Sequence, residues 1–156
     1  FTFLINDLVI EMYGKTLAKR MVYTGFILSL VAWVTLCFIQ IYPPARPSDL
    51  SLNHLFFGAT VLSSITAYLF GQLTDISTYH WIGTKTEALW LRSLGSTLIS
   101  QLLDTLIVNG LLFFVFAGEP LSEVLPLVIA SYLYKAIIAT LMVPLFYRMV
   151  YVLRPA

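Results

Sequence analysis

The chain has 156 residues, of which 59% are hydrophobic and 11% are charged, and its formal net charge at pH 7 is +1. A soluble domain usually carries about 25% charged residues, so this composition excludes an ordinary soluble globule, and the few scattered basic residues give no support for nucleic acid as a partner. Apolar runs of about 20 residues, long enough to cross a bilayer, recur along the chain. The sequence therefore predicts an all-α, polytopic transmembrane helical bundle.

Five hydrophobic segments follow one another. Residues 1–13 form the end of one helix, and whole spans are predicted at about 22–42, 54–81, 91–117 and 124–152. Pro43, Pro44 and Pro47 end the first whole span because proline does not continue a helix. The chain starts inside an apolar stretch, without an initiator Met or a basic signal-peptide region. We therefore expect residues 1–156 to be a single transmembrane domain, truncated at its N-terminus.

The basic residues are distributed unevenly between the two sides of the predicted bundle. Alternate connections hold seven of them against one, and Lys135 remains inside a span; the seven are Lys15, Lys19, Arg20, Lys85, Arg92, Arg148 and Arg154, and the one is Arg46. Cytoplasmic connections of membrane proteins carry the excess of Lys and Arg. Segments 14–20 and 82–92 and the C-terminus are therefore predicted to be cytoplasmic.

Several ionisable residues fall inside the predicted spans. Asp104 and Lys135 each lie about eleven residues into their spans, which places both near the midplane at a rise of about 1.5 Å per residue. A charge there costs at least about 2.5–3.5 kcal/mol, so such residues are candidates for a functional site. We expect Asp104 and Lys135 to form an ion pair. Asp7 and Asp75 should share a second depth, nearer the cytoplasmic side, and Glu11 either joins the site or pairs with Lys15 one turn on.

Two phrases repeat an amide and a carboxylate three residues apart: Gln72-Leu73-Thr74-Asp75 and Gln101-Leu102-Leu103-Asp104. In a helix this spacing places both groups on one face. Thr97 and Thr105 extend the second phrase into a polar stripe, which should face the bundle interior rather than lipid.

Asp7, Asp75 and Asp104 outnumber Lys135, the one cation placed firmly inside the hydrocarbon. Either some of these carboxyl groups are protonated, or a cation or cationic substrate balances them. Both alternatives suit a transporter coupled to protons or sodium, and the sequence leaves the coupling ion open. No cofactor, metal site or hydrolytic motif is indicated, so we do not expect an enzyme.

The stretches "DLVIEMYGKTLAKR", "GQLTDISTYHWI", "LWLRSLGSTLISQLLDT" and "YLYKAIIATLMVPLFY" resemble the integral membrane family of vitamin-uptake transporters that includes queuosine precursor transporters. The resemblance runs from about residue 6 to residue 147. It implies a six-helix bundle, of which one N-terminal helix and part of the next would be absent here. It also implies import of 7-cyano- and 7-aminomethyl-7-deazaguanine across the bacterial cytoplasmic membrane.

The family's motif residues map onto this chain, and we carry seven of them over as substrate-binding candidates: Asp7, Gln72, Asp75, Gln101, Asp104, Thr105 and Lys135. Asp104 and Gln101 are expected at the centre of the site, with Asp75 and Gln72 on its cytoplasmic side. Tyr132, Tyr134 or Phe70 could stack on the base.

An alternative interpretation is a substrate-binding subunit of an energised vitamin importer, like an S-component. An energising partner would then dock on segments 14–20 and 82–92. The sequence also leaves open whether copies of the chain associate with one another.

Overall fold

The computed structural model describes residues 2–40, 54–118 and 120–153, and all of its regular structure is helical. The helices are α1 (Thr2–Tyr13), α2 (Lys15–Gln40), α3 (His54–Gly83), α4 (Leu89–Asn109), the π-helix η1 (Gly110–Ala117) and α5 (Leu121–Leu153). The described residues of every predicted apolar span are helical, with the span 91–117 divided between α4 and η1, which confirms the all-α prediction. The three prolines and Arg46 of the connection 43–53 lie outside the described residues.

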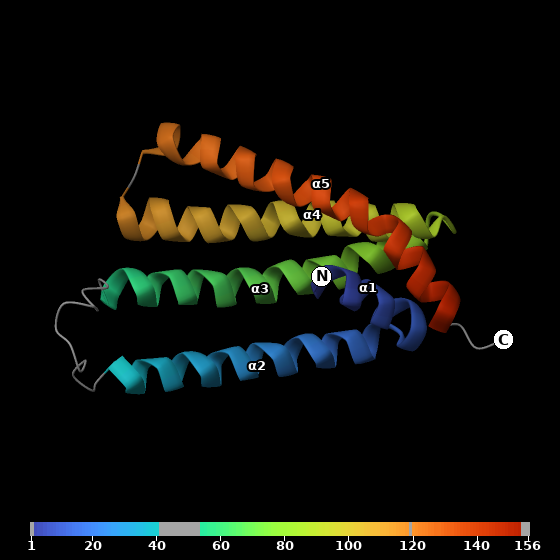
Figure 1. Cartoon of the computed structure of the whole chain (residues 1–156), viewed down its shortest axis with the longest axis horizontal. Helices are drawn as coiled ribbons and strands as arrows, with labels where there is room; N and C mark the ends of the chain where they lie inside the picture. Colours follow the sequence, from blue (N-terminus) through green and yellow to red (C-terminus); the bar gives the residue numbers. More distant parts are fainter. Residues whose placement is uncertain (1, 41–53, 119, 154–156) are drawn as a thin grey trace.

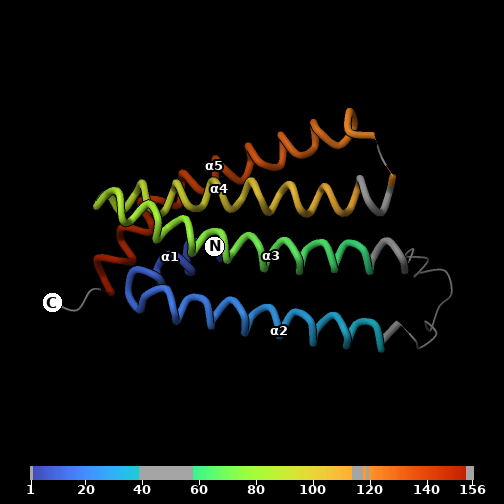
Figure 2. Tube along the Cα trace, turned by 180° about the vertical axis from the view of Figure 1, so that it is seen from behind, coloured from blue at the N-terminus to red at the C-terminus, as the bar shows by residue number. Residues whose placement is uncertain are grey.

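The long helices lie side by side in chain order (Figure 1). α3 packs most extensively against α4, and α5 and α2 flank this central pair. The short helix α1 lies alongside the half of the bundle that is nearer to the α1–α2 turn, as Figure 2 also shows from behind. α5 changes direction in its C-terminal part (Figure 1), where Pro144 stands inside the helix and removes one backbone hydrogen bond.

Two glycines with positive φ mark helix ends. Gly14 (φ 85°) separates α1 from α2, and Gly118 (φ 70°) ends η1. This left-handed conformation has no steric penalty for glycine. At Gly14 the chain reverses within one residue, so α1 folds back beside the start of α2.

Three of the four long helices are long and apolar enough to cross a membrane: Lys15–Phe38, Leu89–Phe113 and Leu121–Leu153. The described part of α3 does not meet that criterion, although the sequence predicts a span there. α3 lies between α2 and α4 in the bundle (Figure 1) and buries Ser63, Gln72 and Asp75. The face of α3 that packs on its neighbours can carry such polar residues because it contacts protein rather than lipid.

The outer faces are apolar, with Leu28 on α2 and Leu133 and Leu141 on α5 all more than half exposed. Contiguous exposed apolar surface of this kind suits contact with lipid. The hydrophobic core lies where α1, α2, α3 and α5 meet, and it includes Val22, Ile76 and Phe146.

The α1–α2 turn, the α3–α4 connection and the end of α5 all lie at one end of the bundle (Figure 1). These are the three positions that the distribution of basic residues assigns to a common side. We call this the basic end, and the opposite end carries the connection between η1 and α5.

Candidate functional site

A cavity of about 350 Å³ opens between α1, α3, α4 and α5. Its lining consists of Thr2, Phe3, Tyr68, Gln72, Gln101, Asp104, Lys135 and Ile138. Four of the seven predicted site residues therefore meet in one cavity, although they come from three different helices. A volume of this size falls within the range of small-molecule sites, about 300–1,000 Å³.

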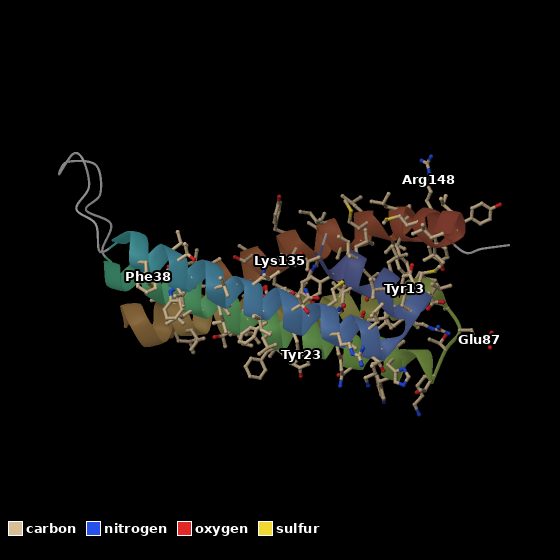
Figure 3. All side chains as sticks on the ribbon, turned by 90° about the horizontal axis from the view of Figure 1, so that it is seen from below. Tyr13, Tyr23, Phe38, Glu87, Lys135 and Arg148 are labelled. Atoms are coloured by element: carbon tan, nitrogen blue, oxygen red, sulfur yellow. The ribbon has the colours of Figure 1, made fainter. Side chains whose placement is uncertain are left out.

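Asp104 and Lys135 form an ion pair across this cavity. Lys135 Nζ lies 2.7 Å from Asp104 Oδ2 and donates a second hydrogen bond to Thr105 Oγ1 at 3.1 Å. The predicted ion pair is thus present, and the fully buried Thr105 supports it without lining the cavity. Figure 3 shows Lys135 at mid-length of the bundle, between Phe38 toward one end and Glu87 at the other. The side chains of Lys135 and Asp104 stay 36% and 20% exposed, so a ligand in the cavity can reach both.

The two predicted glutamines present their amides to the same cavity. Gln72 is only 2% exposed, and the Oε1 atoms of Gln72 and Gln101 accept no hydrogen bond from any residue that the structure describes. A buried carbonyl without a donor is costly, and such groups in native proteins usually find a partner. A terminal amide turns about its last torsion and can offer either its oxygen or its NH₂ group. These two amides are therefore suited to pair with a polar ligand.

The aromatic side chains of the cavity are Tyr68 and Phe3, which the sequence did not single out. The Tyr68 hydroxyl lies against Gly25 of α2, where an added Cβ would overlap the hydroxyl oxygen. The aromatic candidates named from the sequence lie elsewhere: Phe70 and Tyr134 are 53% and 68% exposed, and Tyr132 is not part of the lining. Nothing in a single sequence distinguishes an inward tyrosine from a lipid-facing one on a helix that is apolar on several faces.

Asp7 and Asp75 are fully buried and do not line the cavity. They form a separate cluster with hydroxyl and amide partners. Ser93 Oγ donates to Asp7 Oδ2 at 2.6 Å, Ser100 Oγ donates to Asp75 Oδ1 at 3.0 Å, and Asn6 Nδ2 donates to Asp75 Oδ2 at 3.2 Å. The expected common depth of these two aspartates fits their meeting in one cluster, which we call the carboxyl cluster.

The serines of this cluster follow one face of α4. Ser93, Ser96 and Ser100 are spaced by three and four residues and are all buried against α1 and α3. Ser96 and Thr97 also approach Asp7, each at 3.5 Å. The spacing was visible in the sequence, but hydroxyls at helical spacing are common in helix packing, so it did not distinguish ligands of a carboxylate from packing residues.

A smaller pocket of about 40 Å³ lies next to the main cavity and shares Phe3, Gln101 and Ile138 with it. Its lining also includes Ser93 and Thr97, both hydrogen-bonded to Asp7. The small pocket thus lies between the main cavity and the carboxyl cluster.

A third polar group lies toward the basic end. Glu11 contacts Arg92 at 3.6 Å and accepts a hydrogen bond from the Tyr79 hydroxyl at 3.0 Å, so α1, α3 and α4 are joined there. The sequence offered Lys15 as a partner for Glu11, and the structure shows Arg92 in that role. A pocket of about 200 Å³ borders the group and is lined by Glu11, Tyr79 and Arg92 among others.

Among the described residues, no three His, Cys, Asp or Glu side chains gather as metal ligands would. The polar groups of the cavity are one ion pair, two amides and the hydroxyl groups of Tyr68 and Thr2. Such groups bind and orient a polar organic molecule by hydrogen bonds and charge.

Comparison with known proteins gives a family match over nearly the whole chain. Residues 1–149 match the family described as "Putative vitamin uptake transporter". The "Probable queuosine precursor transporter" of Bacillus subtilis (strain 168) is 31% identical over 153 residues, which cover 93% of this chain and 66% of that protein. The "Queuosine precursor transporter" of Escherichia coli (strain K12) is 25% identical over 144 residues, 89% of this chain and 63% of that protein. The chain thus spans slightly less than two thirds of these relatives, and no solved structure matches it.

Proposed function

This chain belongs to the vitamin uptake transporter family, and on that premise we propose that it imports 7-deazaguanine precursors of queuosine through the mid-bundle cavity. The family is one of multi-pass membrane transporters, not of enzymes. The names of the two relatives supply the substrate class. The observation that carries the proposal is the set of polar groups in the cavity: an ion pair and two glutamine amides whose carbonyl oxygens accept no hydrogen bond from the described residues.

The edge of a 7-deazaguanine base complements this set. N1–H and the exocyclic amino group are adjacent donors, which a carboxylate accepts side by side, and O6 is an acceptor for an ammonium or an amide NH₂. Asp104 supplies the carboxylate, Lys135 the ammonium, and Gln72 and Gln101 the amides. Tyr68 and Phe3 are positioned to contact the ring faces, and base–aromatic stacking contributes about 1–3 kcal/mol per base.

The 7-substituent gives the two precursors different charges. The aminomethyl compound is a cation and the cyano compound is neutral. Asp104 is already paired with Lys135, so the site is close to neutral before the substrate arrives. We therefore propose that the base edge, which both precursors share, is the main recognition element. Asp7 and Asp75 remain outside the proposed contacts because both are fully buried.

We place the protein in the bacterial cytoplasmic membrane with the basic end inside. The support is the positive-inside distribution, together with a fold that brings the α1–α2 turn, the α3–α4 connection and the C-terminal end of α5 to one end (Figure 1). The cavity then lies at mid-membrane, where transporter sites are commonly formed.

The test is uptake of labelled 7-cyano-7-deazaguanine by cells that cannot make the precursor, with the full-length protein expressed. Asp104→Asn and Lys135→Met should each reduce uptake at least about tenfold, the equivalent of one lost charge-assisted hydrogen bond of about 1.5–3 kcal/mol. Lys85→Met is the matched control, because Lys85 is exposed in the α3–α4 connection and far from the cavity.

All variants must be present in the membrane at the wild-type amount. Wild-type protein that accumulates neither the cyano nor the aminomethyl compound above a vector control would remove the substrate assignment. Full uptake by both cavity variants would instead show that Asp104 and Lys135 do not bind the substrate.

A further inference from the structure

We propose that Asp7 and Asp75 form a proton-binding site, separate from the substrate cavity, in which the two carboxyl groups share a proton. The geometry of the carboxyl cluster carries the proton-binding part of this inference. Its use in driving uptake rests on the function proposed above.

The first observation is that two fully buried carboxyl groups lie against one face of α4 without a cation. Asp7 and Asp75 are both 0% exposed, and the serines that contact them, Ser93 and Ser96 for Asp7 and Ser100 for Asp75, succeed one another on that face within about two turns. Within the described residues, neither lies within ion-pair distance of a Lys or Arg side chain; their hydrogen-bond partners are hydroxyl groups and the Asn6 amide. Two adjacent carboxylates in a low-dielectric interior are disfavoured by desolvation and by mutual repulsion, and a shared proton removes both penalties.

The second observation concerns a neutral side chain of the cluster, Asn6. Asn6 is fully buried, its Nδ2 donates to Asp75, and its Oδ1 accepts no hydrogen bond within the described part of the chain. Ionised carboxylates only accept hydrogen bonds, so they leave this oxygen unsatisfied. A protonated carboxyl group adds one donor to a cluster that has an acceptor without one.

The charged and titratable groups around the cluster are already paired among themselves. Toward the basic end, Glu11 on α1 contacts Arg92 on α4 and Tyr79 on α3. Toward the cavity, Asp104 on α4 contacts Lys135 on α5. Neither group supplies a positive charge to Asp7 or Asp75, so a bound proton is what reduces the negative charge of this pair.

The bonds at the cluster favour a proton over a sodium ion. A bound cation needs oxygen lone pairs directed at it. Here the carboxyl oxygens already have donor groups beside them: Ser93 Oγ lies 2.6 Å from Asp7, and Asn6 Nδ2 lies 3.2 Å from Asp75. We therefore commit to the proton, and sodium is an outcome that the experiment distinguishes.

The position of the cluster suits transfer of a proton between the cavity and the basic end. On one side, Ser93 and Thr97 contact Asp7 and also line the small pocket that borders the cavity at Gln101. On the other side, Glu11 and Tyr79 stand four residues after Asp7 and Asp75, one helical turn closer to the basic end, and border the 200 Å³ pocket. Each carboxyl group is thus one turn from a group that reaches a pocket.

The mechanical link to the cavity is short. Asp75 is three residues from Gln72 on α3, and Ser100 is adjacent to Gln101 on α4. Gain or loss of the proton changes the hydrogen bonds of Asp75 and Ser100, and the backbones that carry them also carry both cavity amides. Inward movement of a proton can therefore be coupled to inward movement of the base.

The first experiment needs no substrate. Infrared spectra of the full-length protein in lipid at neutral pH should contain the carbonyl band of a protonated carboxylic acid, which shifts on exchange into D₂O. The double variant Asp7→Asn/Asp75→Asn should lose the band, and the matched control Asp104→Asn, whose carboxylate is paired with Lys135, should keep it. If the double variant cannot be purified, each single Asn substitution must shift the band because it changes the hydrogen-bond partner.

The second experiment uses liposomes containing the full-length protein. An acidic exterior should raise uptake of the labelled base by wild type, whereas an inward sodium gradient should not. The double variant should bind the base within about threefold of wild type, as expected for residues outside the cavity, and should lose the response to the proton gradient.

These results separate the two proposals. A wild type without the infrared band, or a double variant that retains it, overturns the proton site. Stimulation by sodium instead of protons overturns it as well. If wild type shows the band but binds no 7-deazaguanine, the proton site stands and the substrate assignment fails.

Discussion

At the scale of single residues, the Lys135–Asp104 pair decides the charge state of the cavity. Both side chains are withdrawn from bulk water but not sealed, at 36% and 20% exposure. Removing one member of a fully buried pair costs about 3–5 kcal/mol because the other charge is left alone. The partial exposure here reduces that cost, so a single substitution should be tolerated by the fold but measurable.

We expect Lys135→Met to lower the free energy of unfolding by about 1–2 kcal/mol, a discounted version of the loss of a fully buried pair. Adding Asp104→Asn should restore most of that loss, since no unpaired charge remains. Thermal unfolding in detergent of wild type, the two single variants and the double variant gives the four stabilities of a double-mutant cycle. Strictly additive losses would show that the two charges do not interact in the folded protein.

Tyr68 depends on a residue of another helix for its place in the cavity. Gly25 leaves room for the phenol hydroxyl, and a methyl group there would overlap the hydroxyl oxygen. Gly25→Ala should therefore turn Tyr68 away and weaken binding of the base by about tenfold, within the range of about 1–3 kcal/mol for one stacking contact. Equilibrium binding measures this, and Tyr68→Ala should show a similar loss.

Gly58→Ala is the matched control for Gly25→Ala, since it makes the same change on α3 at a site with open space around it. It should leave affinity unchanged. Equal effects of the two alanines would mean that the loss reflects a general effect of alanine in these helices, and the positioning role of Gly25 would then be wrong.

At the scale of elements, the close approach of α3 and α4 brings the cavity amides together. A Cβ at Gly71 would lie 3.4 Å from Asp104 Cβ and 3.7 Å from the Ser100 carbonyl oxygen. A methyl group would just fit, but a larger side chain would press α4 away. Gly71 directly precedes Gln72, so this displacement would act on the cavity itself.

Gly71→Val should cost about 1–3 kcal/mol of stability, as overpacking typically does, and should also reduce uptake. Gly110→Val is its control, because a Cβ atom added at Gly110 would meet no atom within 4 Å outside the adjacent backbone. Thermal unfolding and uptake are measured on both variants. A stable, active Gly71→Val protein would show that α4 can move without disturbing the site.

The elements were largely predictable, because apolar length and proline positions depend on local chemistry. The charged residues near the midplane were equally informative. Burial of an unpaired charge is costly, so a partner was expected for Asp104, and Asp104 pairs with Lys135. The sequence did not predict which of the seven candidate site residues line the cavity and which belong to the carboxyl cluster. Asp75 and Gln72 share a helix face, yet Gln72 lines the cavity while Asp75 turns to Asn6 and Ser100. That outcome depends on how α1 packs, which no spacing within α3 encodes.

At the scale of the whole molecule, the basic residues and the fold agree on one common end. The α1–α2 turn, the α3–α4 connection and the C-terminal end of α5 lie together (Figure 1), and six of the chain's nine Lys and Arg residues lie on the described parts of these segments. An excess of basic residues is retained on the cytoplasmic side. Each end of the bundle therefore has an expected side of the membrane, and a chemical label can test both at once.

The chain has one cysteine, Cys37, so a Cys37→Ser background leaves no native thiol in this region. In that background Lys85→Cys places a thiol at the basic end and Ser122→Cys places one at the start of α5, both at exposed positions. A membrane-impermeant maleimide should label intact spheroplasts at position 122 and reach position 85 only after the membrane is opened. The reverse pattern would place the basic end outside the cell. The Glu11–Arg92 group and the pocket of about 200 Å³ beside it would then lie on the external side. Inward protons would meet that group first, so the labelling also fixes the direction in which the carboxyl cluster would have to work.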